Sequence, residues 1–251
     1  MKIVLLYPQF TDIYGNYKPA AQVGVAYPPL GLMYLASSLE RDNHDVTIID
    51  SEIEGLSKKD VARIIRVLKP DVVGITSTTP IHHKAMELFK VIKNVDASIT
   101  TIAGGPHPTA IPEQTLKDSP EIDVVVIGEA EETIREFCKG KNYSEIDGIC
   151  FRYKGRIKVT KKRKLIANID SLPLPARHLI KNEKYLWSVP KKGIMPVSPI
   201  MTVRGCPYKC VFCSQFVTFG YCTRYRSVEN IIKEIDAVSY THLTLPTTPY
   251  V

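Results

Sequence analysis

The chain has 251 residues, of which 44% are hydrophobic and 24% charged, and its net charge is +7. These are ordinary values for a globular protein, and the length exceeds the roughly 100–150 residues of a single domain, so we expect two domains. The longest apolar runs fall far short of the roughly 20 residues of a membrane helix. The sequence therefore excludes a membrane-spanning segment and predicts a cytoplasmic protein with reduced cysteines.

The positive charge is concentrated in one segment. Residues 152–192 hold 13 Lys or Arg against two carboxylates, a charge of +11, whereas the rest of the chain carries −4. A basic stretch can bind nucleic acid, but more often it is a solvated face. The run Lys161-Lys162-Arg163-Lys164 has no aromatic interleaving, so nucleic acid is not an expected partner.

The first part of the chain alternates short apolar runs with helical patterns. Short apolar runs predict strands, and apolar positions three and four residues apart predict helices. Strands are predicted at residues 2–7, 45–50, 71–76, 99–103 and 123–127, and helices at 29–41, 58–68 (capped by Ser57), 83–93 and 112–117. Five strands separated by helices predict an α/β fold with a doubly wound parallel five-stranded sheet in residues 1–140.

Small and polar residues follow these strands, at the edge where doubly wound sheets bind ligands. The candidate binding residues are Ser77, Thr78, Gly104, Gly105, Gly128 and Glu129. A double glycine lets a ligand approach the backbone, although it also allows a tight turn, and hydroxyls supply short neutral hydrogen-bonding groups. No G-x-G-x-x-G follows the first strand, so a nicotinamide dinucleotide is not indicated. The histidines in this region are expected at the surface or in turns and not as ligands: His82, His83 and His107.

After residue 140 the pattern changes. Residues 148–159 predict a β-hairpin with Gly155 in its turn, and residues 169–175 are too rich in proline for a helix. We assign residues 141–195 to this hairpin and linker. Residues 196–237 are assigned to a second domain, which begins with a strand at 199–204 and continues with a helix from Ser227 to residue 238.

Three cysteines lie within eight residues: Cys206, Cys210 and Cys213. Thiolates are the ligands of 4Fe-4S clusters, which normally take four of them, so three would leave one iron open. An open position distinguishes a reactive metal site from a closed structural one, by analogy with zinc. A zinc site or simple buried thiols are the alternatives, but the nearest further zinc ligands are only Cys222 and His242. The other two cysteines, Cys138 and Cys150, are expected in the core.

The spacing C-x-x-x-C-x-x-C, with an aromatic residue before the last cysteine, resembles the signature of the radical S-adenosylmethionine (radical SAM) enzymes. By that resemblance the three cysteines hold a 4Fe-4S cluster. Its open iron would bind S-adenosyl-L-methionine and cleave it to a 5'-deoxyadenosyl radical, with Tyr208 and Phe212 beside this cofactor. The resemblance also implies a small-molecule substrate and an external electron donor, a flavodoxin or ferredoxin.

The first part of the chain resembles the cobalamin-binding domain, of Rossmann or flavodoxin type, that precedes the barrel in one large subclass of radical SAM proteins. The motifs that match this subclass in order and spacing are Pro28-Pro29-Leu30-Gly31-Leu32, Gly104-Gly105-Pro106-His107 and Gly128-Glu129-Ala130-Glu131. The resemblance implies that Ser77, Gly104 and Gly105 line the slot for the nucleotide tail of cobalamin. No D-x-H-x-x-G follows the first strand, so we expect that no histidine ligates the cobalt. A domain that has lost the cofactor is the alternative.

The resemblance implies an enzyme that transfers a methyl group, or rearranges or cyclises an unidentified substrate, and it assigns no catalytic residue. The alternative is a non-catalytic corrinoid carrier or electron-transfer protein, which a fourth cysteine ligand would favour. Residues 196–237 would form only the first unit of a truncated (β/α) barrel, so we expect this chain to be a fragment that cannot complete the reaction. Residues 238–251 resemble the translation of a sequencing-library adapter, and we expect them to end the helix and to pack against nothing.

Overall fold

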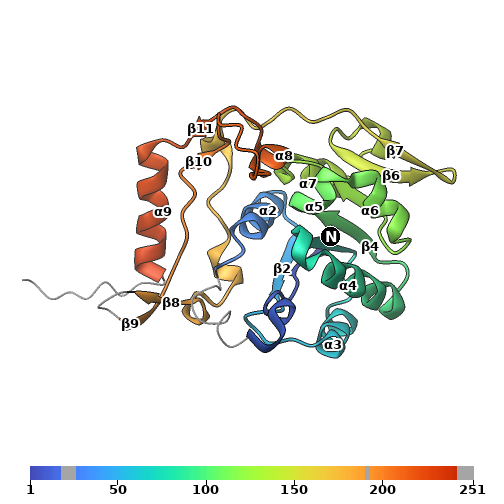
Figure 1. Ribbon diagram of the computed structural model, residues 1–251, viewed down its shortest axis with the longest axis horizontal. Helices are drawn as coiled ribbons and strands as arrows, with labels where there is room; N and C mark the ends of the chain where they lie inside the picture. Colours follow the sequence, from blue (N-terminus) through green and yellow to red (C-terminus); the bar gives the residue numbers. More distant parts are fainter. Residues whose placement is uncertain (18–26, 190–192, 242–251) are drawn as a thin grey trace, which may run out of the picture.

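A computed structural model describes residues 1–17, 27–189 and 193–241. Its centre is a sheet with the strand order β2-β1-β3-β4-β5-β6-β7 (Figure 1). The first five strands in the sequence pair in parallel, and the last two pair antiparallel. These strands are β1 (Lys2–Tyr7), β2 (Asp45–Asp50), β3 (Val72–Thr76), β4 (Thr100–Gly104), β5 (Val124–Val126), β6 (Ile149–Tyr153) and β7 (Arg156–Val159).

The five predicted parallel strands are present, but the predicted number of five strands is wrong. The hairpin expected in the linker continues the sheet, since Val125 pairs with Cys150, and Cys150 pairs with Val159. The reason is burial: Ile149, Cys150 and Phe151 are all buried, and an isolated hairpin could not cover them on both faces. The sheet therefore extends past residue 140 to Val159.

Helices cover both faces of this sheet. One face carries α2 (Leu30–Glu40) and α7 (Glu131–Cys138), and the other carries α3 (Lys58–Leu68), α4 (His82–Val95) and α6 (Pro112–Asp118). Successive strand residues point to opposite faces, so Ile3 packs in the core under α2 whereas Val4 packs under α3 and α4. Burial of each such side chain contributes roughly 1.5–3 kcal/mol.

Helix α3 forms over the predicted residues because its first turn is capped. The Ser57 hydroxyl accepts a hydrogen bond from the Asp60 N–H at 3.3 Å, and the Asp60 carboxylate accepts one from the Ser57 N–H at 3.1 Å. This reciprocal arrangement satisfies two otherwise unpaired donors of the helix N-terminus. The predicted Ser57 cap is confirmed.

The part of the chain after β7 lies on the α2 side of the sheet (Figure 1). Its helices and strands are β8 (Leu186–Val189), β9 (Gly193–Pro196), β10 (Val203–Arg204), α8 (Gln215–Phe219), β11 (Arg224–Tyr225) and α9 (Val228–Thr241). The strand predicted at 199–204 is shorter than expected, because only its last two residues pair, antiparallel to β11. The barrel to which these elements would belong stays a prediction. The remaining short helices are α5 (Pro106–Ala110) and 3-10 turns at Thr11–Tyr17, Thr79–Ile81, Tyr143–Glu145, Ile169–Ser171, Arg177–Leu179 and Asn182–Lys184.

Helix α9 does not end where the adapter-like stretch begins. It continues to Thr241, so the prediction that residues from 238 onward break the helix is wrong. The expectation that this stretch packs against nothing is also wrong at its first residue, since Val238 is only 3% exposed. Val238 lies one turn beyond the buried Glu234, on the same face of the helix. Residues 242–251, including His242, lie outside the described residues.

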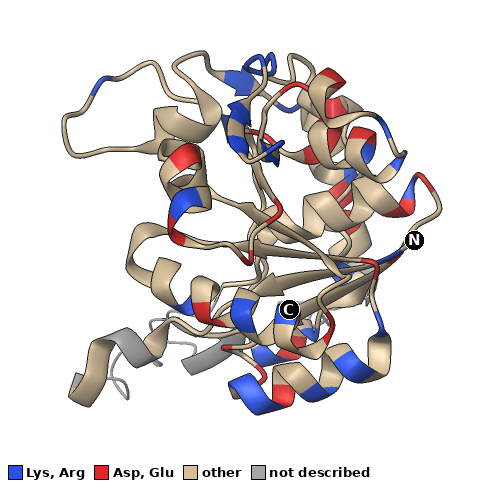
Figure 2. Ribbon diagram, turned by 90° about the vertical axis from the view of Figure 1, so that its right-hand side faces the viewer, with Lys and Arg blue, Asp and Glu red and all other residues tan. Residues whose placement is uncertain are grey.

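Charged residues of both signs occur in many parts of the described chain. Acidic and basic positions are interspersed along the helices (Figure 2). Within the basic segment, Arg163 pairs with Glu136, and Lys158 lies over the ring of Tyr153 at 4.1 Å from its centroid. Among the described residues, no helix is long and apolar enough to span a membrane.

Candidate functional site

A mostly apolar cavity of about 350 Å³ lies at the carboxyl edge of the sheet. It runs from the strand ends at Tyr7 and Gly104 down between the sheet and α2, where Leu5 and Leu35 form its walls. Ligands of open α/β sheets bind at this edge. The cavity is therefore the candidate binding site, as the polar and small residues after the strands predict.

Glycines on two neighbouring strands keep the cavity open. A Cβ atom at Gly104 would meet nothing within 4 Å, whereas one at Gly74 would lie 3.1 Å from Cδ2 of Leu5. Both glycines line the cavity. The absence of side chains at these two positions leaves a narrow apolar part of the cavity beside the backbone, which we call the slot. Its shape suits a flat, largely apolar group.

Gly105 also lines the cavity, but a close approach explains the residue type. Its φ is +94°, and a Cβ atom would lie 2.6 Å from Oγ1 of Thr76 and 2.8 Å from the carbonyl oxygen of Ser77. The backbone turns here so that the ends of β3 and β4 pack directly on each other, with the His107 N–H donating to the Ser77 carbonyl at 3.2 Å. The tight-turn explanation therefore holds for Gly105, and Gly104 is the position that faces open space.

Ser77 and Thr78 do not belong to the cavity lining. The buried Ser77 hydroxyl lies 3.1 Å from Nδ1 of His82, and Thr78 is exposed. The ring of His82 packs against that of His107 with centroids 3.9 Å apart. Burial lowers the pKa of His82 to about 4 and also lowers the pKa of His107, so both rings are neutral at pH 7. A cofactor contact at Ser77 or Thr78 stays a prediction.

Glu129 and Glu131 connect the sheet to the two strands beside the cysteines. Both carboxylates are buried and line the cavity. Glu129 accepts hydrogen bonds from Arg204 at 3.1 Å, from Arg224 at 2.7 Å and from the Ile166 N–H at 2.8 Å. Glu131 accepts one from Arg204 at 2.5 Å. The carboxylate of Glu129, predicted as a cofactor contact, is thus held by β10 and β11, while the residue still lines the cavity.

No role was assigned to Arg204 or Arg224 from the sequence. Their carboxylate partners lie 73 to 95 positions away, beyond any local pattern. A signal was nevertheless present: two carboxylates directly follow a strand that is apolar throughout, where solvent is not expected. A carboxylate beside a buried strand needs a cationic partner.

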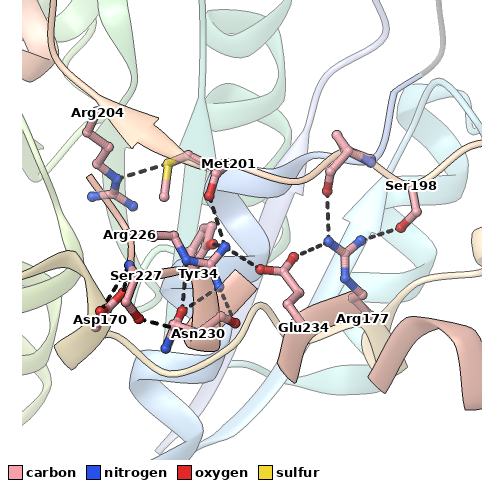
Figure 3. A network of polar contacts seen from close by, with 11 residues as sticks. Tyr34, Asp170, Arg177, Ser198, Met201, Arg204, Arg226, Ser227, Asn230 and Glu234 are labelled. Carbon is pink, nitrogen blue, oxygen red and sulfur yellow. Dashed lines mark hydrogen bonds and ion pairs between the residues drawn. The ribbon is translucent and has the colours of Figure 1, made fainter. Parts of the chain in front are cut away.

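A second buried network fixes α9 (Figure 3). Glu234 pairs with Arg226 at 2.5 Å and also with Arg177. Arg226 in addition donates to the hydroxyl of Tyr34 in α2 at 3.2 Å, and burial raises the pKa of Tyr34 to about 12. The Ser227 N–H, at the start of α9, donates to the Asp170 carboxylate at 3.1 Å. These contacts join α9, α2 and the linker.

The backbone at the start of the cysteine loop, residues 205–214, is closely packed. Gly205 has a φ of +84°, and a Cβ atom there would lie 2.0 Å from the carbonyl oxygen of Cys222, so only glycine fits. Beyond it Cys206 is half-buried, and Cys210 and Cys213 are exposed and joined by a backbone hydrogen bond of 3.1 Å. The aromatic neighbours predicted beside the cofactor are exposed as well, Phe212 at 89% and Tyr208 at 74%.

The three sulfurs fit an iron-sulfur cluster in kind, since thiolates are its ligands. In the described part of the chain, however, no three side chains of His, Cys, Asp or Glu are grouped closely enough to hold a metal ion. Cys138 and Cys150 are buried as predicted, and burial raises the pKa of Cys138 to about 12 and of Cys150 to about 11, so neither is a thiolate at pH 7. The assignment of the loop cysteines as ligands stays a prediction.

Comparison with known proteins finds a family model and several sequence relatives that match this chain. A family model described as a B12 binding domain matches residues 19–138. An uncharacterized methyltransferase of Pyrococcus horikoshii is 39% identical over 244 residues, which cover 96% of this chain and 51% of the relative. An anaerobic magnesium-protoporphyrin IX monomethyl ester cyclase of Rubrivivax gelatinosus is 29% identical over 251 residues, with coverage of 96% and 43%. The chain thus spans about half the length of these relatives.

Solved structures share the fold. The radical S-adenosylmethionine methyltransferase TsrM from Kitasatospora setae, with cobalamin and a [4Fe-4S] cluster bound, superposes with a TM-score of 0.68 at 15% identity, covering 95% of this chain and 46% of that one. The cobalamin-dependent S-adenosylmethionine radical enzyme OxsB, with aqua-cobalamin and S-adenosylmethionine bound, gives a TM-score of 0.75 at 20% identity, covering 96% and 32%.

Proposed function

This chain belongs to the cobalamin-binding radical SAM proteins, and from that premise we propose that it binds cobalamin in the slot beside Gly104 and a 4Fe-4S cluster on Cys206, Cys210 and Cys213. In the complete enzyme the cluster would cleave S-adenosylmethionine to a 5'-deoxyadenosyl radical. The outcome would be methyl transfer to a small molecule, with rearrangement or cyclisation as the second possibility. The names of the relatives favour methyl transfer, because the relative with the higher identity is a methyltransferase.

The slot is the observation that carries the cobalamin assignment. It is apolar, lies at the edge of the sheet where such ligands bind, and is open at Gly104. The flat, largely apolar nucleotide base of cobalamin fits these walls. Ser77 and Thr78, which lie outside the lining, would then act at the rim of the slot.

The cluster assignment rests on donor chemistry and on position. The three thiols lie on one loop whose anchoring strands border the slot through Glu129 and Glu131. Held by Cys206, Cys210 and Cys213, the cluster would supply the electron for reductive cleavage of S-adenosylmethionine, and Tyr208 and Phe212 would lie beside that cofactor. A flavodoxin or ferredoxin is the proposed electron donor. All six cysteines are unpaired by disulfides, which suits a reducing compartment such as the cytoplasm.

We propose a division of the chain that follows the sheet. Residues 1–159 would form the cobalamin-binding domain, because the hairpin β6–β7 completes its sheet. Residues 160–195 would form the linker, and residues from 196 onward the start of the radical SAM domain.

A titration with hydroxocobalamin tests the proposal. Gly104→Leu should fill the slot and weaken binding by about five- to 150-fold, since overpacking costs roughly 1–3 kcal/mol and 1.4 kcal/mol is a factor of ten. Gly104→Ala should weaken binding less than Gly104→Leu does, because a single Cβ clashes with no protein atom and fills less of the slot. Lys90→Leu is the matched control, since it adds the same side chain at an exposed position of α4. Absence of binding by a folded wild-type protein would refute the cobalamin assignment.

A further inference from the structure

Both ends of the cysteine loop form part of the cavity wall. Arg204, which directly precedes the loop, lines the cavity, and so does Phe219 in the helix that follows the loop. The guanidinium of Arg204 also lies 5.6 Å from the ring centroid of Phe219, so the two anchors contact each other. A ligand that fills the cavity would therefore touch the residues from which the cysteine loop departs.

A balanced set of buried charges fixes these anchors. We call Glu129, Glu131, Arg204 and Arg224 the Glu–Arg bridge; all four are buried, at 7% exposure or less. Two carboxylates face two guanidinium groups, and the contacts are short, at 2.5 to 3.1 Å. Paired charges that have lost their water keep a fixed mutual geometry, because a displaced partner would leave an uncompensated charge. A shift of one side chain of the bridge therefore shifts the side chains paired with it.

The two carboxylates differ in how many partners hold them. Glu129 is held by two arginines and by the Ile166 N–H, whereas Glu131 contacts Arg204 in this bridge. Glu131 also begins α7, whose residue Ile134 lines the cavity one turn further on. Glu131 thus joins a helix that covers the slot to the residue that starts the cysteine loop. Removal of its charge would weaken this one connection and leave Arg204 with Glu129.

We propose that Glu131 is a positioning residue which, through Arg204, couples occupation of the cavity to the arrangement of the cysteine loop. The inference rests on the proposed function, because it takes cobalamin as the ligand of the cavity and an iron-sulfur cluster as the ligand of the loop. Coupling between two sites is reciprocal. Cobalamin in the slot therefore favours cluster assembly, and an assembled cluster tightens cobalamin binding by the same factor.

The test compares the affinity for hydroxocobalamin before and after anaerobic reconstitution with iron and sulfide, on the full 251-residue chain. We expect the cluster-loaded wild type to bind about five- to tenfold more tightly, within the usual range of coupling. In Glu131→Gln the ratio of the two affinities should fall clearly below the wild-type ratio, because the Glu131 contact to Arg204 is weakened. Glu132→Gln is the matched control: its carboxylate, the next residue along the helix, pairs with Arg135 near the surface, and the wild-type ratio should be retained.

The outcomes separate this inference from the proposed function. If the wild type binds hydroxocobalamin and assembles a cluster but shows equal affinities in both states, the coupling is wrong and the proposed function stands. If it binds no hydroxocobalamin or assembles no cluster, both fail. Should Glu131→Gln not fold, Glu131→Asp keeps the charge and retracts it by one methylene, and a reduced affinity ratio is expected. A wild-type ratio in the folded variant would overturn the role of Glu131.

Discussion

Replacement of Glu234 tests how α9 is held against the rest of the chain. Its carboxylate is 1% exposed and lies between the guanidinium groups of Arg177 and Arg226, both of which are themselves buried (Figure 3). Glu234→Gln keeps the size of the side chain and removes its charge. Two buried arginines would then lose their carboxylate partner, which is the situation in which a broken buried ion pair costs most.

The expected loss in the free energy of unfolding is about 3–5 kcal/mol, the cost of leaving a buried charge uncompensated. The value should lie toward the lower end, because Arg226 keeps the Tyr34 hydroxyl and the Asn230 side chain as acceptors and Arg177 keeps the Pro199 carbonyl. A typical domain is stable by only about 5–15 kcal/mol. The loss is therefore large enough to measure and small enough to leave a folded fraction.

Urea unfolding, followed by the single tryptophan and by circular dichroism, measures the loss. Limited proteolysis should in parallel show earlier cleavage within α9, because its attachment to α2 and the linker is weakened. Glu229→Gln is the control, since Glu229 is an exposed residue in the first turn of the same helix. An equal urea midpoint for Glu234→Gln and Glu229→Gln would show that the buried network does not hold α9.

Two further predictions concern the cysteines and the pH dependence of stability. Replacing any one of the three loop cysteines by alanine should remove most of the visible absorbance of a reconstituted cluster, whereas Cys222→Ala should retain it; equal cluster content in all four variants would refute the ligand set. Bidentate hydrogen bonding by Arg135 at 2.7 and 2.9 Å holds the pKa of Asp42 well below its usual value, so this pair stabilises the fold fully above about pH 4 and progressively less as the pH falls toward the folded-state pKa. The difference in urea midpoint between wild type and Asp42→Asn should therefore be full at pH 7 and shrink below about pH 4, and a constant difference down to pH 3 would contradict this linkage.

Local signals in the sequence predicted most of the sheet domain. The five parallel strands and helix α3 follow from apolar periodicity and from the Ser57 cap, which are properties of neighbouring residues. The place of the hairpin did not follow, because its pairing with β5 depends on which sheet edge is free in the folded protein. The apolar strand Ile149–Tyr153 signals burial but not the partner that provides it.

The candidate site, like the fold, could be predicted only where the signal lies in neighbouring residues. Gly104 and the loop cysteines could be proposed from the sequence because a glycine after a strand and a fixed cysteine spacing are local patterns. The arginines of β10 and β11 were missed, since their partners are fixed only by the fold. The end of α9 was missed for a related reason: residues 238–241 resemble foreign sequence, but an α-helix tolerates many residue types, and Val238 falls on its buried face.

The buried charge pairs of the Glu–Arg bridge fix orientation in a way that apolar packing would not. Apolar burial is non-directional and tolerates sliding of one surface over another, whereas a guanidinium held by carboxylates is fixed in orientation. Replacing a buried ion pair by apolar residues is often neutral or stabilising, so stability alone does not explain why Arg204 and Arg224 occupy these positions. The ion pairs fix where the cysteine loop leaves the folded part of the chain. That point is Gly205, which packs directly on the backbone of Cys222 beside an otherwise apolar slot. Beyond that origin Cys206 is half-buried and Cys210 and Cys213 are exposed, so the loop has its buried charged contacts at Arg204 and Arg224, before and after the cysteines.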